Sequence, residues 1–251
     1  MTGFIPLLKK ELKEQWKTNK VLILSSVFLL FGISIPLSYK YMPDLLKLSK
    51  QPINITIPTF TAGQTLAGYA GNIGQVGLLV IVLVAMGAVA TELRSGTAVI
   101  TLSKPISYSA FINTKFLAMS LNIIFSLTVA SLVCFAYTFW LIGSSDIISY
   151  IGMNLLLLVF LEFSLAVTLI CSCLFKSSVA CGGLSLGILI FQAIISSLPV
   201  IGKYMPGKLL DWGNNLLTGS NITYWWSLGI ALALTFGCLV LAPQALKSKE
   251  I

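Results

Sequence analysis

Few residues in this sequence could carry out chemistry at an active site. The chain has no histidine, which removes the usual acid–base residue of catalytic triads and the ligands of HExxH zinc sites. Residues 202–208, GKYMPGK, have the glycine-to-lysine spacing of a phosphate-binding loop, but Leu209 replaces the hydroxyl residue that would bind Mg²⁺. No strand is expected before this segment, so we do not expect the chain itself to bind ATP.

The cysteines predict no metal or redox site either. None of the five belongs to a CxxC pair, and all lie in or beside apolar stretches, where cysteine usually acts as a small apolar residue. We therefore expect no catalytic residue, no metal site and no cofactor bound by this chain.

Glu162 is an ionisable residue near the centre of an apolar stretch, residues 151–175. Inserting such a group into a membrane costs a few kcal/mol, and the group usually faces protein or water. One interpretation is structural, with the carboxyl group hydrogen-bonded to a neighbouring helix near Asn122. The other interpretation places Glu162 on a path through the membrane.

A compact polar segment follows the apolar stretch 73–90, which carries no charge and would cover about 27 Å as a helix, roughly one hydrocarbon core. Its polar and turn-forming residues are Glu92, Arg94, Gly96, Thr97, Lys104 and Pro105. Ser107 or Ser109 could begin the next helix, and Lys115 ends this segment, residues 92–115. The segment suits contact with a partner protein, or it is an ordinary loop that keeps its charges in water. We expect the charges of Glu92 and Arg94 to add little to folding stability.

The composition is that of a membrane protein. Hydrophobic residues make up 57% of the chain and charged residues 10%, whereas soluble domains are about one quarter charged. The 251 residues have room for about six spans and no large soluble domain. We predict one all-α membrane domain, residues 1–251, with spans at 21–37, 73–90, 116–141, 151–175, 179–200 and 224–241. Longer loops are expected at 40–70 and 201–223.

Membrane lipid explains the net charge of +8 more simply than nucleic acid does. The basic residues are spread among loops and are not gathered with exposed aromatic residues, so we expect no nucleic-acid partner. Residues 1–20 place Phe4, Leu8, Leu12 and Trp16 on one face and lysines on the other. This pattern predicts an amphipathic helix in the cytoplasmic membrane interface, with its lysines towards anionic lipid.

The distribution of Lys and Arg predicts the orientation. With the N-terminus inside, the cytoplasmic side holds eleven of these residues and the outer side five. The inner residues are Lys9, Lys10, Lys13, Lys17, Lys20, Arg94, Lys104, Lys115, Lys176, Lys247 and Lys249, and the outer residues are Lys40, Lys47, Lys50, Lys203 and Lys208. We therefore expect a plasma-membrane protein with both termini in the cytoplasm.

Two sets of glycines are spaced for close contact between helices. Gly71, Gly74 and Gly77 recur at intervals of three, and Gly183 with Gly187 has the GxxxG spacing. We assign both sets to packing against a second subunit. The first set could instead loosen its helix near the outer mouth, where backbone beside a water-filled cavity is tolerated.

The short motifs around the polar segment resemble those of one transporter family. AMGAVATE, RSGT, LSKPIS and FINTK follow one another as in the permease subunits of ABC transporters of the type-two export family, which includes NosY-like and sodium- or antibiotic-efflux permeases. The resemblance implies that Glu92, Arg94, Gly96 and Thr97 begin a coupling helix between the second and third spans. Lys104 and Pro105 match the basic residue and proline that follow it. This helix would sit in a groove of a separate cytoplasmic ATPase, which would bind ATP and Mg²⁺.

The resemblance also implies a second permease subunit, identical or related, and a path lined mainly by the second and fifth spans. The candidates on that path are Asn72, Gln75, Gln192 and Ser196, ahead of Glu162. We therefore predict the permease subunit of an ATP-driven exporter, which is not itself an enzyme. One alternative is a membrane scaffold or assembly factor. A membrane-embedded enzyme is a less favoured alternative, because it would need a cluster of ionisable groups.

Overall fold

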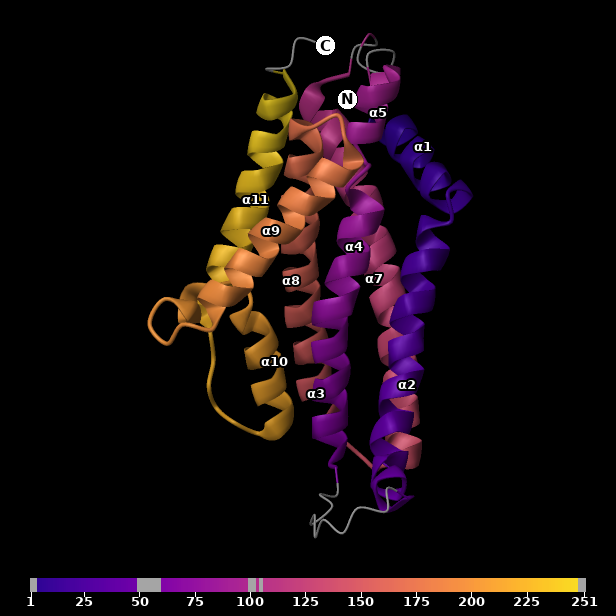
Figure 1. Ribbon diagram of the computed structural model, residues 1–251, viewed down its shortest axis with the longest axis vertical. Helices are drawn as coiled ribbons and strands as arrows, with labels where there is room; N and C mark the ends of the chain where they lie inside the picture. The colour runs from indigo at the N-terminus through magenta and orange to yellow at the C-terminus, as the bar shows by residue number, and fades with distance from the viewer. Residues whose placement is uncertain (1–3, 49–59, 99–102, 104–105, 248–251) are drawn as a thin grey trace.

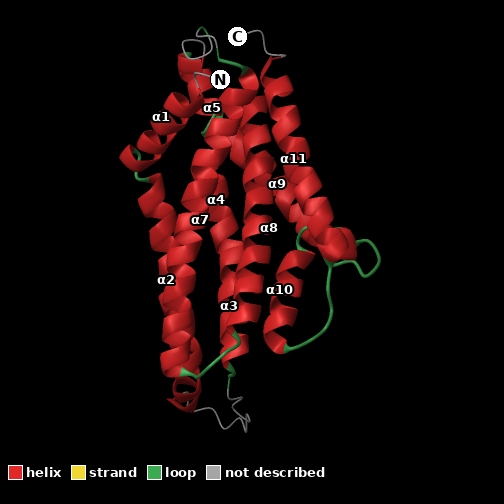
Figure 2. Cartoon of the chain, turned by 180° about the vertical axis from the view of Figure 1, so that it is seen from behind, coloured by secondary structure: helices red, strands yellow, loops and turns green. Residues whose placement is uncertain are grey.

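The computed structural model describes residues 4–48, 60–98, 103 and 106–247, and within these ranges every regular element is a helix. Six helical segments are long and apolar enough to cross a membrane. Most run along the long axis of the bundle. The start of α1 (Phe4–Lys17), the end of α11 (Trp225–Lys247) and α5 (Ala90–Ser95) share one end (Figures 1 and 2). The predicted all-α membrane fold is confirmed.

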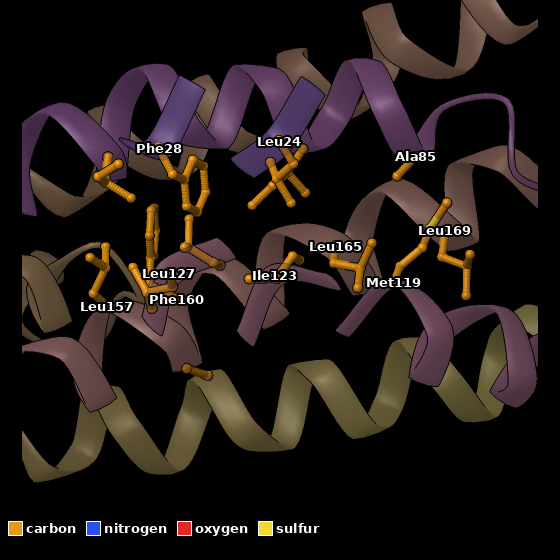
Figure 3. Close-up of a cluster of buried hydrophobic side chains, with 14 of the residues drawn as sticks. Leu24, Phe28, Ala85, Met119, Ile123, Leu127, Leu157, Phe160, Leu165 and Leu169 are labelled. Atoms are coloured by element: carbon orange, nitrogen blue, oxygen red, sulfur yellow. The ribbon is translucent and has the colours of Figure 1, made fainter. Parts of the chain in front are cut away.

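Helix α8 (Ile147–Leu174) forms the centre of the bundle. In its most apolar stretch 72% of the residues are buried, against 28% in α9 (Ser178–Ser196) and 17% in α11. Phe160 of α8 lies in a buried cluster with Phe28 of α2 (Lys20–Leu48) and Leu127 of α7 (Tyr108–Leu141; Figure 3). The outer faces of α9 and α11 keep exposed apolar side chains, as helices that face lipid do.

The first two spans are longer than the sequence pattern predicted. Helix α2 continues to Leu48 and α3 (Ala62–Asn72) begins well before residue 73, so the loop expected at 40–70 is wrong for the described residues on both sides. Pro43 lies inside α2, because neighbouring groups in a membrane bundle can satisfy the backbone that a proline frees. At the start of α3, Thr61 Oγ1 accepts a hydrogen bond from the Gln64 backbone at 3.3 Å, and Gln64 Oε1 accepts one from the Thr61 backbone at 3.1 Å.

The second span is one interrupted helix. After α3 the chain forms a wide π-helical turn, Ile73–Gly77, then α4 (Leu78–Ala85), a break at residues 86–89 and α5. A Cβ added to Gly74 would lie 2.8 Å from Leu210, and one added to Gly77 would lie 2.9 Å from Phe28. These two glycines therefore serve contacts inside the subunit, and not the contact with a second subunit that was assigned to them.

The loop expected at 201–223 contains a helix. After a 3₁₀ turn at Gly202–Tyr204, α10 (Lys208–Thr218) packs beside α3 and α8 (Figure 1). Trp212 points into the bundle, and Gly213 lets α10 approach Met153 of α8, because an added Cβ would lie 3.0 Å from Met153 Cγ. Packing of one apolar face on two neighbours is enough to stabilise so short a helix.

Asp146 caps the start of α8. Its carboxylate accepts hydrogen bonds from Ser149 Oγ at 2.6 Å and from the backbone N–H groups of Ile148 and Ser149 at 3.3 and 3.0 Å. These bonds, above all that from the Ser149 hydroxyl, hold the pKa of Asp146 below its usual value.

Candidate functional site

Helix α5 carries the first of the residues assigned to coupling. Arg94 is exposed at this end of the bundle, and the helix stops at Gly96, whose φ of 73° is a left-handed conformation that favours glycine. Thr97 is exposed just beyond it. Lys104 and Pro105 lie outside the described residues.

Ser172 of α8 fixes the break that precedes α5. Its Oγ accepts hydrogen bonds from the backbone N–H groups of Val89 and Ala90, both at 3.0 Å, and donates one to the carbonyl oxygen of Met86 at 3.0 Å. These bonds satisfy backbone groups that the break at 86–89 removes from the helical ladder. The position of α5 is therefore tied to the central helix.

A group of charges around the buried Lys115 holds α5 to α1 and α7. The ammonium group of Lys115 lies 3.0 Å from both carboxylate oxygens of Glu11 and 2.8 Å from Oε1 of Glu92, and the Lys115 side chain is only 2% exposed. Lys10 Nζ lies 3.4 Å from Glu11 and from Glu92 and 3.8 Å from Glu14. We call Lys10, Glu11, Glu14, Glu92 and Lys115 the Lys115 cluster.

The position of Glu92 beside the buried Lys115 corrects the expectation that the charge of Glu92 adds little to folding. Ser107 caps α7 by accepting a hydrogen bond from the Ala110 backbone, so Lys115 lies two turns inside that helix and not at its start. The Glu92 side chain is 12% exposed and turns towards Lys115. Arg94 consequently presents a charge to the outside, whereas Glu92 anchors α5.

Opposite charges compensate each other within the Lys115 cluster. Oxygen atoms of Glu11, Glu14 and Glu92 lie within 4.8 Å of one another, a spacing that could hold a cation, but the ammonium groups of Lys10 and Lys115 lie among them. Burial alone would lower the pKa of Lys10, but the carboxylates of Glu92, Glu11 and Glu14 outweigh it and raise that pKa above its usual value. The cluster is therefore an ion-pair network that joins three helices.

Glu162 lies apart from this network. Its Oε1 accepts a hydrogen bond from Ser120 Oγ of α7 at 2.7 Å. Asn122, expected beside it, instead donates to Gln15 Oε1 of α1 at 3.1 Å, because residues 120 and 122 point about 200° apart around a helix. A hydrogen bond between helices is what the structural interpretation of Glu162 requires.

Three of the residues predicted to line a path meet at one cavity. Gln75, Gln192 and Ser196 line a space of about 520 Å³ between the π turn, α4, α9 and the start of α10, and this space is partly open at the surface. The side chain of Asn72 is not among those that line it, because its amide donates to the carbonyl oxygen of Gly68 on its own helix at 2.8 Å. Glu162 is also absent from the lining, since it points away from Phe160, which faces the cavity from α8.

Two charged residues that the sequence analysis did not assign to the path also line this cavity. Lys208 Nζ and Asp211 Oδ2 form an ion pair at 2.7 Å within the first turn of α10. Their spacing of three residues in an amphipathic segment is the sequence signal that could have found them.

The remaining glycines assigned to a second subunit face open space. A Cβ added to Gly71, Gly183 or Gly187 would meet nothing within 4 Å. Gly183 and Gly187 are exposed on α9, so a second helix could approach there, and their contact with another subunit stays a prediction.

Comparison with known proteins agrees with this architecture. Residues 5–220, which include α5, the Lys115 cluster and the cavity, match the family described as ABC-2 family transporter protein. The chain is also 24% identical over 243 residues to the uncharacterized transmembrane protein YxlG of Bacillus subtilis (strain 168), and the match covers 92% of each chain. This multi-pass membrane chain therefore belongs to the ABC-2 transporter family.

Proposed function

We propose that the chain is the permease subunit of an ATP-driven exporter, that its α5 end receives the motion of a separate cytoplasmic ATPase, and that its cavity is part of the transport path. The ATPase, and not this chain, would bind ATP and Mg²⁺. A second permease, identical or related, would complete the path on the open side of the cavity.

One observation carries this proposal: a single interrupted span holds both parts. The π turn and α4 supply Gln75 and Leu79 to the cavity, and α5 follows the break in the same span. Leu79 and Glu92 are about 20 Å apart along a helical path of 1.5 Å per residue. Displacement of α5 would therefore reach the cavity wall through the backbone.

The fixation of α5 supports its proposed role in coupling. A loose loop would absorb a push from a partner, whereas α5 is tied to α8 through Ser172 and to α1 and α7 through Glu92. Interfaces and packed helices of this kind switch between discrete arrangements instead of bending continuously. The bundle could in this way change from an inward-facing to an outward-facing state.

The orientation that we propose places α5 and both chain ends in the cytoplasm, with the protein in the plasma membrane. The basic residues support it: α1, whose start lies at the same end of the bundle as α5, presents exposed Lys9, Lys13 and Lys17, suited to the anionic inner leaflet.

Substitution at the exposed face of α5 tests the proposed function. The tagged full chain, purified in mild detergent from its native membranes, should retain an ATP-hydrolysing subunit, and Arg94→Glu should reduce its retention. Lys203→Glu is the matched control, because Lys203 is exposed in the connection after α9 and is not part of α5. Equal retention by both variants, or no ATPase with the unaltered chain, would contradict the proposed coupling.

A further inference from the structure

The chemistry of the cavity points to the class of molecule that it holds. Building on the proposed function, we propose that the cavity binds a neutral amphiphile that has an apolar body and an uncharged hydrogen-bond acceptor, such as an ester or amide carbonyl. Inorganic ions and multiply charged solutes are outside this class.

The walls of the cavity fit an apolar body. Its lining includes Leu78 and Leu79 of α4, Leu189 and Ile190 of α9 and Phe160 of α8. Its volume of about 520 Å³ is within the range, about 300–1,000 Å³, of pockets that hold small organic molecules. Burial of apolar surface against these walls would supply most of the affinity.

A hydrogen-bond donor without a partner lies in the lining. Gln192 is 8% exposed, and its Nε2 has no hydrogen-bond partner among the described residues. The donor lies beside Gly207, where an added Cβ would come within 3.0 Å of Nε2 and 2.6 Å of Ser196 Oγ. A buried donor without a partner is unfavourable, so an acceptor on the ligand would stabilise this site.

The charges of the cavity cancel. Lys208 and Asp211 are the charged residues in its lining, and they pair with each other at 2.7 Å. Asp211 is 51% exposed, so the pair itself is weak, but it leaves no unpaired counter-charge in the lining. A charged solute would therefore leave water for a largely apolar space without compensation, which is unfavourable. The absence of net charge therefore selects against ions.

Photo-crosslinking of the full chain without any ATPase tests this proposal separately from the proposed function. The chain, in phosphatidylcholine nanodiscs, is irradiated with a neutral benzophenone ester or with a matched probe that carries a sulfonate in place of the ester. We expect the neutral probe to label peptides of α4, α9 and α10, and the sulfonate probe to leave them unlabelled. Equal labelling by both probes, or no labelling of these helices, would overturn the proposal.

Variants test the role of the donor. Gln192→Leu should weaken binding of the neutral probe about tenfold, the usual effect of one lost hydrogen bond, whereas Gln244→Leu, an exposed residue of α11 outside this cavity, should not. If Gln192→Leu does not fold, Leu79→Trp, which fills the cavity from an exposed position, should abolish labelling. Unchanged labelling in the variants that fold contradicts the site.

Competition distinguishes the two sources of such a ligand. Excess dioleoylglycerol that removes the labelling would identify a membrane lipid, and excess butyl benzoate that removes it would identify a small solute. Labelling that resists both competitors would contradict a neutral carbonyl-bearing ligand. Failure of ATPase retention in the Arg94→Glu experiment would leave these binding results intact.

Discussion

Replacement of Lys115 by methionine should destabilise the chain strongly, because this ammonium group is buried between carboxylates. Lys115→Met keeps most of the side-chain volume but leaves the carboxylates of Glu11 and Glu92 buried without their main partner. Removing one member of a buried ion pair typically costs about 3–5 kcal/mol. We expect a loss near the lower end, about 3 kcal/mol, because Lys10 lies 3.4 Å from both carboxylates and is 47% exposed, so it compensates in part.

Two further variants test whether the loss of stability in Lys115→Met comes from uncompensated buried charge and not from the loss of any charge in the cluster. Glu14→Gln removes a member of the same cluster whose side chain is 39% exposed and whose ion pair is 3.8 Å long, so it should cost about 0–1 kcal/mol. The triple variant Lys115→Met, Glu11→Leu and Glu92→Leu should regain most of the stability, because it leaves no uncompensated buried charge among the three residues.

Denaturation of the purified chain in mild detergent measures these differences. Hydrogen exchange of the α1 and α5 backbone should rise in Lys115→Met, because the cluster joins these helices to α7, while exchange in α8 should change little. The reasoning is refuted if Lys115→Met is no more destabilising than Glu14→Gln, or if the triple variant is the least stable of the three.

Three further substitutions test the fold around the site. Ser172→Ala should lower stability by about 2 kcal/mol or more in detergent denaturation, because it leaves buried backbone groups at the break without partners. Ser185→Ala, which loses one bond within its own helix and a weak side-chain bond with Cys171, should cost less. Gly77→Ala should destabilise the chain by about 1–3 kcal/mol, because the added methyl group would collide with Phe28. Gly187→Ala faces open space and should be neutral or slightly stabilising. A larger loss of stability in Gly187→Ala than in Gly77→Ala would contradict the packing. The cap formed by Asp146 has a lowered pKa, so its contribution is present above the ordinary aspartate pKa and is lost as pH falls through the lowered value. Melting temperatures at neutral pH and near pH 3 should therefore differ less in Asp146→Ser than in the unaltered chain.

The number and character of the spans could be predicted from sequence because they depend on composition along a window of residues. Their ends could not, because local signals decided them. The pair Thr61 and Gln64 forms a capping box that begins α3 within the segment predicted as a loop. Pro43 lies in the same predicted loop, but α2 accommodates it.

The Lys115 cluster shows what a single sequence does not reveal. Glu11 and Lys115 are 104 residues apart, and Glu92 and Lys115 are 23 residues apart, so no local pattern pairs them. The positive-inside rule favoured a cytoplasmic position for Lys115 but does not distinguish a solvated charge from a buried one. A weak signal was present in α1, where Leu7, Glu11 and Gln15 form a second face at intervals of four residues, and this is the face that is buried.

The π turn explains why only some of the residues predicted to line a path meet at the cavity. Asn72 and Gln75 would lie near one another on a regular α-helix, but the wider turn at Ile73–Gly77 changes their relative directions. Gln75 consequently faces the cavity, while Asn72 bonds to its own helix. Gln192 and Ser196, four residues apart on the unbroken helix α9, share one face as the regular period requires.

The break at residues 86–89 affects how a displacement of α5 would reach the cavity. A continuous helix from the cavity to α5 could rotate or slide as one rod, but the break is fixed by Ser172, and α5 is fixed by the Lys115 cluster. Since separation of the buried pair costs several kcal/mol, a partner that pushes on α5 would move it together with α1 and the start of α7. The displacement would then pass to the cavity along two routes: through α4, and through α7, which packs on α2 and hence on the Phe28 side chain against Gly77.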